Sequence, residues 1–339
     1  MEGRVEMKIY NCEITHVTEL HAIHSQWLDL YSKLADATPF LRPEWIINWW
    51  KVFGNDNLRG VAFKDVQGKL RGLALFFIYD SNYGRTLSLV GSGISDYSDI
   101  LIEQECDRGV ISSHLADYIR SIRSQWDICD FQQLRDSSLL LTKANSLSTR
   151  RLVSIIDVCP VLKLPEKASE LIPMLRSKKL RRNIRTGIKK VEKHGELKVE
   201  KANDQTVDSF LDDIISLHSF RWEMKEEAGI FSEKRVREFH RLAARELIKS
   251  GALHLYRFSL NGRLCAAYYI LSHREKSFGY IGGFDPMLTD LSLGSVCLYR
   301  IISDLIDSKI RLFDFLRGAE NYKYSWGALN RYNYRLLLK

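Results

Sequence analysis

Proline and low-complexity sequence are scarce in this 339-residue chain. It contains six prolines, and no stretch is rich in glycine, serine or proline. Long flexible linkers have that composition, so none is expected. No run of about 18 apolar residues occurs, so no membrane-spanning helix is predicted. The N-terminal segment MEGRVEMKIYNCEITHV is charged and lacks the apolar centre of a secretory signal. These absences predict a cytoplasmic protein.

Cysteine is equally sparse, and its residues are scattered. They are Cys12, Cys106, Cys129, Cys159, Cys265 and Cys297. No two form a CxxC pair, so neither a zinc site nor a disulfide framework is predicted. We expect buried free thiols in a reducing compartment and no bound metal. His16, His21 and His24 lie close together but lack a carboxylate at metal-ligand spacing, and we expect them on the surface.

The length and the prolines predict two domains. A hydrophobic fraction of 45% is enough to fill two cores. Pro160 and Pro165 punctuate a boundary, which gives an N-terminal domain over 1–160 and a C-terminal domain over 161–339.

The positive charge is concentrated in one segment. The formal net charge is +8, and the stretch from Arg176 to Lys201 alone holds eleven basic and three acidic residues. Apolar residues recur there at helical spacing, which predicts a basic helix over 169–194. Such a face is either solvated, or it contacts phosphates of coenzyme A, tRNA or another anion, or it lies on an acidic membrane surface.

The two halves share a repeated order of elements. The segments VAFKDVQGKLRGLALFFIY (61–79) and LYRFSLNGRLCAAYYILSH (255–273) each read as a β-hairpin, the second around Asn261-Gly262. Each is followed by a strand, a helix and the strand WDICDFQQLR (126–135) or IRLFDFLRG (310–318). The sequence therefore predicts a duplicated mixed α/β unit.

Three segments of the C-terminal half resemble a known family. KLRRNIRTGIKKVEKHGELKVE (179–200), YIGGFDPMLTDLSLGSVCLYRII (280–302) and FDFLRGAENYKYSWGA (313–328) resemble CelD-type acetyltransferases, GNAT relatives that are similar to the Fem aminoacyltransferases. The resemblance implies tandem GNAT-like domains in a Fem-like two-lobed architecture, with a degenerate N-terminal copy. It also implies acetyl-CoA, or another acyl-CoA, as co-substrate.

In the GNAT fold the donor enters a gap between two splayed strands, with its pyrophosphate at the N-terminus of the helix that follows. The usual glycine-rich phosphate loop is replaced here by Ser292, Leu293, Gly294 and Ser295. Ser292 is expected to cap the helix, and Gly294 and Ser295 to offer N–H groups to phosphate. A plain helix start without a ligand is the alternative.

Polar residues gather after the last strand of the C-terminal unit, where α/β sheets bind ligands. Acyl transfer to an amine needs a base, an oxyanion donor and an acid for the thiolate. We expect Glu320 or Asp285 as base and Tyr322 as acid or oxyanion donor. The residues expected to bind substrate are Arg221, Trp222, Asp314, Arg317 and Lys323. A solvated loop is the alternative for the segment after the strand, and a buried core position for Trp222.

The leading hypothesis is an N-acyltransferase, transferring acetyl to an amino sugar or another small amine in polysaccharide or cell-envelope biosynthesis. One alternative is a Fem-like transferase with aminoacyl-tRNA as donor. Another is a non-catalytic protein that binds nucleic acid or another polyanion through the basic helix, which predicts steeply salt-dependent binding. Peripheral membrane contact stays open.

Overall fold

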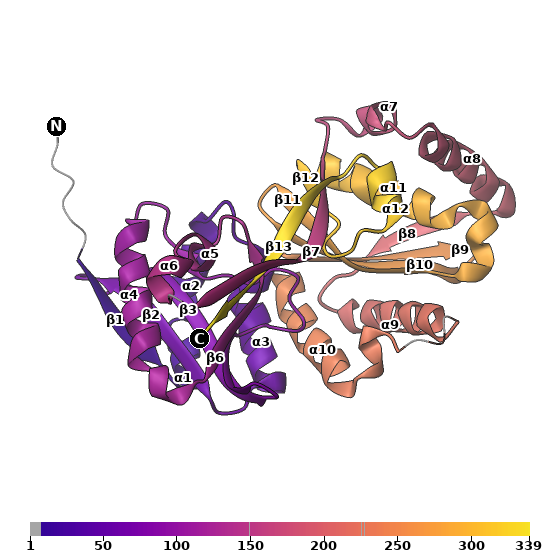
Figure 1. The fold of residues 1–339 in the computed structure, drawn as a ribbon. Coiled ribbons are helices and arrows are strands. Elements are labelled where there is room, and N and C mark those ends of the chain that lie inside the picture. The colour runs from indigo at the N-terminus through magenta and orange to yellow at the C-terminus, as the bar shows by residue number, and fades with distance from the viewer. Residues whose placement is uncertain (1–7, 149, 225, 227) are drawn as a thin grey trace, which may run out of the picture. The chain divides into compact units, whose positions relative to one another are not determined.

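The computed structural model describes residues 8–148, 150–224, 226 and 228–339. The chain forms two compact units (Figure 1). The N-terminal unit comprises residues 1–157 together with 332–339, and the C-terminal unit comprises 158–331. The sequence placed the division between 160 and 161 and kept the last residues in the second domain; in the structure Tyr332–Lys339 return to the first unit.

A mixed sheet forms the centre of the N-terminal unit. Its strands are β1 (Ile9–Ile14), β2 (Leu58–Asp65), β3 (Leu70–Ser81), β4 (Gly84–Leu89), β6 (Ile128–Arg135) and β13 (Leu329–Leu338), in that order, with β5 (Leu101–Ile102) beside β3. The helices are α1 (Val17–Ala22), α2 (His24–Lys33), α3 (Pro43–Phe53), α4 (Arg108–Ser121), α5 (Leu139–Thr142) and α6 (Ala144–Leu147), with short 3-10 turns at Pro39–Leu41 and Arg123–Gln125. One apolar core joins these strands to α4, α5 and α6.

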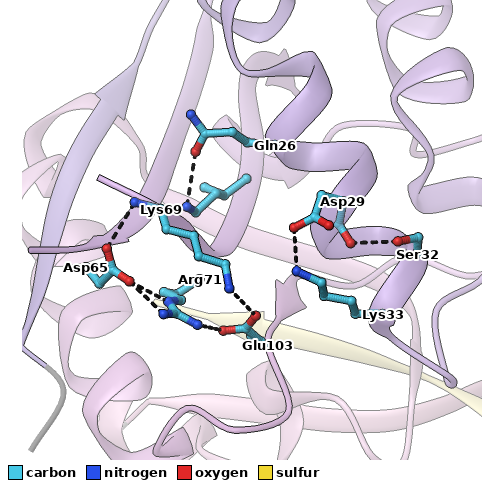
Figure 2. A network of polar contacts seen from close by, with 9 residues as sticks. Gln26, Asp29, Ser32, Lys33, Asp65, Lys69, Arg71 and Glu103 are labelled. Atoms are coloured by element: carbon cyan, nitrogen blue, oxygen red, sulfur yellow. Dashed lines mark hydrogen bonds and ion pairs between the residues drawn. The ribbon is translucent and has the colours of Figure 1, made fainter. Parts of the chain in front are cut away.

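A network of charged side chains fixes the β2–β3 hairpin (Figure 2). Asp65 accepts hydrogen bonds from the amides of Gln67 and Lys69 and from Arg71. Arg71 also pairs with Glu103, which Lys69 approaches to 3.3 Å. Both carboxylates are almost fully buried, so their charges are compensated inside the fold.

Mixed β-sheet also forms the centre of the C-terminal unit. Its order is β7 (Arg151–Lys163), β12 (Leu312–Asp314), β11 (Lys276–Phe284), β10 (Arg263–His273), β9 (Leu253–Leu260) and β8 (Leu197–Lys201). The helices are α7 (Leu171–Met174), α8 (Lys178–His194), α9 (Val207–Glu223), α10 (Lys234–Lys249), α11 (Leu293–Asp307) and α12 (Asn321–Ser325), with 3-10 turns at Ala168–Glu170, Ile230–Ser232 and Pro286–Leu291. Figure 1 shows α8, α11 and α12 on one face of this sheet and α9 and α10 on the other.

The predicted mixed α/β fold and its repeated order are confirmed. β2, β3, β4, α4 and β6 follow one another as β9, β10, β11, α11 and β12 do. In both units two strands on either side of the helix in the sequence pair in parallel over a few residues only: β4 with β6 at Thr86–Leu87 and Ile128–Cys129, and β11 with β12 at Lys276–Phe278 and Leu312–Asp314. The hairpin turn at Asn261-Gly262 also forms, with φ of 51° and 81° at the two residues, as a type I′ turn needs.

One predicted helix has different bounds. The basic helix expected over 169–194 begins only at Lys178, because the backbone is extended at Leu175 after the short α7, and Ser177 caps a new helix by accepting from the amide of Leu180.

Three further observations bear on the expected properties. Within the described part of the chain no helix has the length and hydropathy needed to cross a bilayer. The same residues contain no group of three or more metal-ligating side chains. All six cysteines are free thiols, and all but Cys12 are buried.

Candidate active site

A cavity of about 550 Å³ lies in the C-terminal unit among α8, α11, α12 and strands β10 to β12. Its interior is apolar, formed by the buried side chains of Ile270, Phe313, Phe315 and Trp326. Its rim is polar and more exposed, with Ser177, Lys179, Asn183, Thr289, Ser292, Ser295 and Tyr322. Such a cavity suits a ligand with one apolar and one charged end.

The cavity opens where β11 and β12 separate. Their parallel pairing ends at Phe278 and Asp314, while β11 continues to Phe284 along the cavity wall. Tyr280 is an extra residue in β11, since Gly279 pairs with Ile270 and Ile281 pairs with Tyr269. A bulge of this kind bends the strand and is frequent beside active sites. Among the described residues, the ladder between β11 and β12 does not extend beyond Phe278, so the main chain of β11 runs on along the cavity wall without β12 beside it.

Gly279 keeps the gap open. A Cβ atom at this position would lie 2.9 Å from Cζ of Phe313, closer than carbon atoms pack. Any side chain at this position would therefore press against the ring that lines the gap, so the cavity depends on glycine here.

The N-terminus of α11 faces the cavity through Ser292, Leu293, Gly294 and Ser295. Ser292 was expected to cap the helix with its side chain; instead it adopts a left-handed backbone (φ 55°) and makes no such bond. The amides of Leu293 and Gly294 have no acceptor among the described residues, whereas that of Ser295 donates to the carbonyl of Ser292. Two free N–H groups at the positive end of a 15-residue helix form a favourable position for an anion.

Helix α8 packs across this end of α11. A Cβ at Gly187 would lie 2.9 Å from the carbonyl oxygen of Leu291, so the two segments are in close contact there. Lys190 donates to the carbonyl of Asp290 at 2.8 Å. The start of α8 also borders the cavity, through Ser177, Lys179, Leu180 and Asn183.

The residues predicted to catalyse lie in different surroundings. Tyr322 lines the cavity, is 52% exposed, and packs edge-on against Phe315. Glu320 is exposed beside it and pairs with Lys323 at 2.9 Å. Asp285 is buried and does not line the cavity: it accepts hydrogen bonds from Arg263 and from the amide of Met287. Through these two bonds Asp285 stabilises the start of the turn that follows β11.

The residues predicted to bind substrate have partners within the fold. The ammonium group of Lys323 is buried and donates to the carbonyls of Leu316, Arg317 and Gly318 at 2.7–3.1 Å. Its donors therefore fix the loop after β12 instead of facing the cavity. Asp314 is also buried and accepts from the amide of Leu316. Arg317 is partly buried and does not line the cavity.

The predicted Arg221 and Trp222 lie on α9, on the opposite face of the sheet. The side chain of Arg221 lies outside the described residues. The indole of Trp222 donates to Nε2 of His218 at 2.8 Å, which fixes this imidazole nitrogen as an acceptor. His240 lies deeper under the same face, where burial lowers its pKa to about 3.

Sequence reasoning missed Lys179, Asn183 and Gly279 as cavity-lining residues. The glycines of YIGGF carried a usable signal, because glycine inside a strand marks a bulge or a close approach. No comparable signal singled out Lys179 among the other basic residues of its helix.

Comparison with known proteins agrees with this geometry. Residues 178–324 match the model of the acetyltransferase (GNAT) domain, so this part of the chain forms a GNAT domain. No curated protein matches the sequence significantly.

Solved structures resemble nearly the whole chain. FemX has a TM-score of 0.65 at 10% identity, covering 96% of both chains. The C-terminal domain of a putative lysylphosphatidylglycerol synthetase from Agrobacterium fabrum has a TM-score of 0.59 at 10% identity, covering 94% of this chain and 92% of that one. A tandem GNAT protein from the clavulanic acid biosynthesis pathway has 0.51 at 11% identity, covering 97% and 98%. The predicted Fem-like tandem GNAT fold is thereby confirmed.

Proposed function

We propose that the C-terminal unit, whose residues 178–324 match the GNAT domain, transfers an acyl group from an acyl-CoA to a primary amine. The observation that carries this proposal is the cavity itself. It joins two helix N–H groups that have no acceptor among the described residues to the part of β11 that extends beyond its ladder with β12, and to an apolar interior. These three environments correspond to the pyrophosphate, the pantetheine arm and the acyl end of such a donor.

The donor would be held mainly by main-chain groups. The amides of Leu293 and Gly294 would receive the pyrophosphate, with the hydroxyls of Ser292 and Ser295 at the same rim. The edge of β11 beyond Phe278 would bind the amides of the pantetheine arm, as an added strand binds a sheet edge. No metal is part of the proposal.

The chemistry is direct transfer. The neutral amine attacks the thioester carbonyl, a C–N bond forms, and the C–S bond breaks. The amine proton passes to Glu320 or to water, and the departing thiolate takes a proton from Tyr322. Tyr322 is suited to this task because its ring borders the cavity while its side chain stays half exposed. Glu320 stands two residues away, next to the same rim.

The acceptor we propose is an amino sugar or another small amine, and acetyl is the donor group to test first. The resemblance of residues 179–200, 280–302 and 313–328 to CelD-type acetyltransferases supports a place in polysaccharide or cell-envelope biosynthesis, and a cytoplasmic location would suit it.

A second candidate is an aminoacyl-tRNA donor, which two observations favour. Helix α8 carries many basic side chains without an acidic partner, and the fold resembles FemX and a putative lysylphosphatidylglycerol synthetase domain. Under this alternative the cavity would take the aminoacyl end of the nucleic acid. Apart from it, we propose no nucleic-acid partner.

Calorimetric titration with acetyl-CoA tests the proposal, with Ser295→Asp as the variant and Ser295→Asn as its control. Asp at this position in the first turn stabilises a helix, by about 0.3–1 kcal/mol, so the variant should fold. Its carboxylate would nevertheless repel the pyrophosphate. We expect micromolar binding to the wild type and to Ser295→Asn, and loss of binding in Ser295→Asp. A wild-type protein that binds no acyl-CoA would overturn the proposal.

A further inference from the structure

The first turn of α8 brings positive charge to the side of the cavity that faces α11. Ser177, Lys179 and Asn183 all line the cavity. Arg182 lies three residues after Lys179, so the two side chains are neighbours on the helix surface. Both are exposed. The lining of the cavity thus includes a cation, Lys179, that makes no ion pair with any described residue, together with Leu293 and Gly294.

Several arginines elsewhere in the C-terminal unit are paired with a carboxylate. Arg245 pairs with Asp208, Arg257 with Asp213 and Arg263 with Asp285, at 2.8–3.2 Å. By contrast, eight basic side chains in and just before α8 make no ion pair with any described residue: Arg176, Lys178, Lys179, Arg181, Arg182, Arg185, Lys189 and Lys193. Unpaired like charges on one helix repel each other, and an anionic ligand would relieve that repulsion.

The position of this charge is fixed by the fold. Leu180, Ile184 and Val191 are buried in the core of the unit, and Gly187 lies against Leu291 and Ser292. The apolar stripe of α8 is therefore used for packing. The helix has no second apolar face to insert into a lipid surface, which argues for a soluble phosphate ligand.

We propose that Lys179 and Arg182, assisted by Asn183, bind the 3′-phosphate of a coenzyme A donor. The inference rests on the proposed acyl-CoA function. Coenzyme A carries a pyrophosphate and, on the ribose at the same end, a phosphomonoester. With the pyrophosphate at the amides of Leu293 and Gly294, the ribose end would lie at the cavity rim, and Lys179 is the cationic side chain among the described residues that line this cavity. Helix α8 accordingly selects donors that are phosphorylated at the 3′ position.

The test compares coenzyme A with 3′-dephospho-coenzyme A by calorimetry on three proteins. These are the wild type, the double variant Lys179→Ala/Arg182→Ala, and the control Lys189→Ala/Lys193→Ala. The control removes the same charge from exposed positions farther along α8. Circular dichroism melts check that all three proteins fold alike.

We expect the wild type and the control to bind coenzyme A at least about tenfold more tightly than the dephospho form, the ratio that one charge-assisted hydrogen bond supplies. The double variant should bind both ligands with similar affinity. Equal binding of the two ligands by the wild type, or a preference that survives in the double variant, would overturn the inference. Failure of the proposed function gives a different result, since the wild type would then bind neither ligand. If the protein bound tRNA in its place, with a steep salt dependence that the control variant weakens, the inference would also be overturned.

Discussion

Replacing Arg71 by Met should lower the unfolding free energy of the N-terminal unit far more than the replacement of an exposed arginine would. Arg71 lies between Asp65, which is 4% exposed, and Glu103, which is 5% exposed (Figure 2). Met fills a similar volume but leaves both carboxylates buried without their shared cation. Breaking a buried ion pair from one side costs about 3–5 kcal/mol of unfolding free energy. Lys69 remains near Glu103 in the variant. If its ammonium group moves closer to that carboxylate, the loss of unfolding free energy should lie at the lower end of this range.

Arg85→Met is the matched control. Arg85 pairs with Asp127 at 2.9 Å, but both side chains are nearly half exposed and screened by water, so the loss of unfolding free energy should be much smaller than in Arg71→Met. Urea unfolding followed by tryptophan fluorescence measures both variants. Five of the seven tryptophans belong to the N-terminal unit: Trp27, Trp45, Trp49, Trp50 and Trp126.

The deficit of Arg71→Met should also depend on pH. Burial alone would raise the pKa of Asp65, but hydrogen bonds from Arg71 and from the amides of Lys69 and Gln67 outweigh it and hold that pKa below its usual value. The stabilisation is therefore present above the ordinary carboxyl range and is lost as pH falls through the folded pKa. In Arg71→Met the carboxylates can protonate to escape buried charge, so its deficit should shrink between pH 7 and pH 4. A deficit equal to that of Arg85→Met, or one unchanged with pH, would refute this reasoning.

Three more predictions concern the C-terminal unit. Tyr322→Phe should lower kcat roughly a hundredfold, and Glu320→Gln should lower kcat less. The melting temperature should not change, because both side chains are exposed. Unchanged turnover in a steady-state assay would exclude the two residues from the mechanism. Lys323→Met removes three hydrogen bonds to carbonyls in the loop next to Tyr322. The loss of about 3 kcal/mol of unfolding free energy should lower the melting temperature by about 6–12 °C. A melting temperature that falls by less than about 2 °C would contradict the buried position of the ammonium group. His240, whose pKa is about 3 in the fold, stays neutral while the same residue in the unfolded chain takes up a proton below about pH 6.5. The unfolding free energy should therefore fall as the pH is lowered from about 6.5 toward 3. In urea titrations His240→Phe should weaken this pH dependence, and an unchanged dependence would count against the burial of His240.

Local chemistry explains which parts of the fold could be predicted from the sequence. The hairpins were predictable because they are determined by local sequence: the turn residues Asn261-Gly262 and the alternating apolar and polar residues of the strands beside such a turn. The segment IRLFDFL reads as a full strand, yet β12 pairs over Leu312–Asp314 only. Its neighbour β11 diverges at the bulge of Tyr280, which depends on contacts far apart in the sequence.

The candidate site was predictable in part for the same reason. The N-terminus of α11 is a local feature, and the residues expected to face a phosphate do line the cavity. Lys323 and Asp285 were chosen because they are polar and near strand ends. Nothing in the sequence indicated that Lys323 would donate its hydrogen bonds to main-chain carbonyls, or that Asp285 would accept one from Arg263. Which of the many basic residues of α8 borders the cavity follows from how Gly187 packs against α11, a tertiary contact.

The return of β13 to the N-terminal unit bears on how the chain is made. Strand β6 pairs with β13 through Cys129–Arg135 and Asn333–Leu338, and Asn333 is buried with its amide on Asp96 and Gln133. During synthesis on the ribosome, the first unit emerges early but lacks this strand until residues 332–339 leave the exit tunnel. The C-terminal unit can close around its own core before that moment. The half of the protein that is translated first is therefore the half that finishes folding last, and nascent chains stalled before residue 332 should expose β6 to chaperones and proteases.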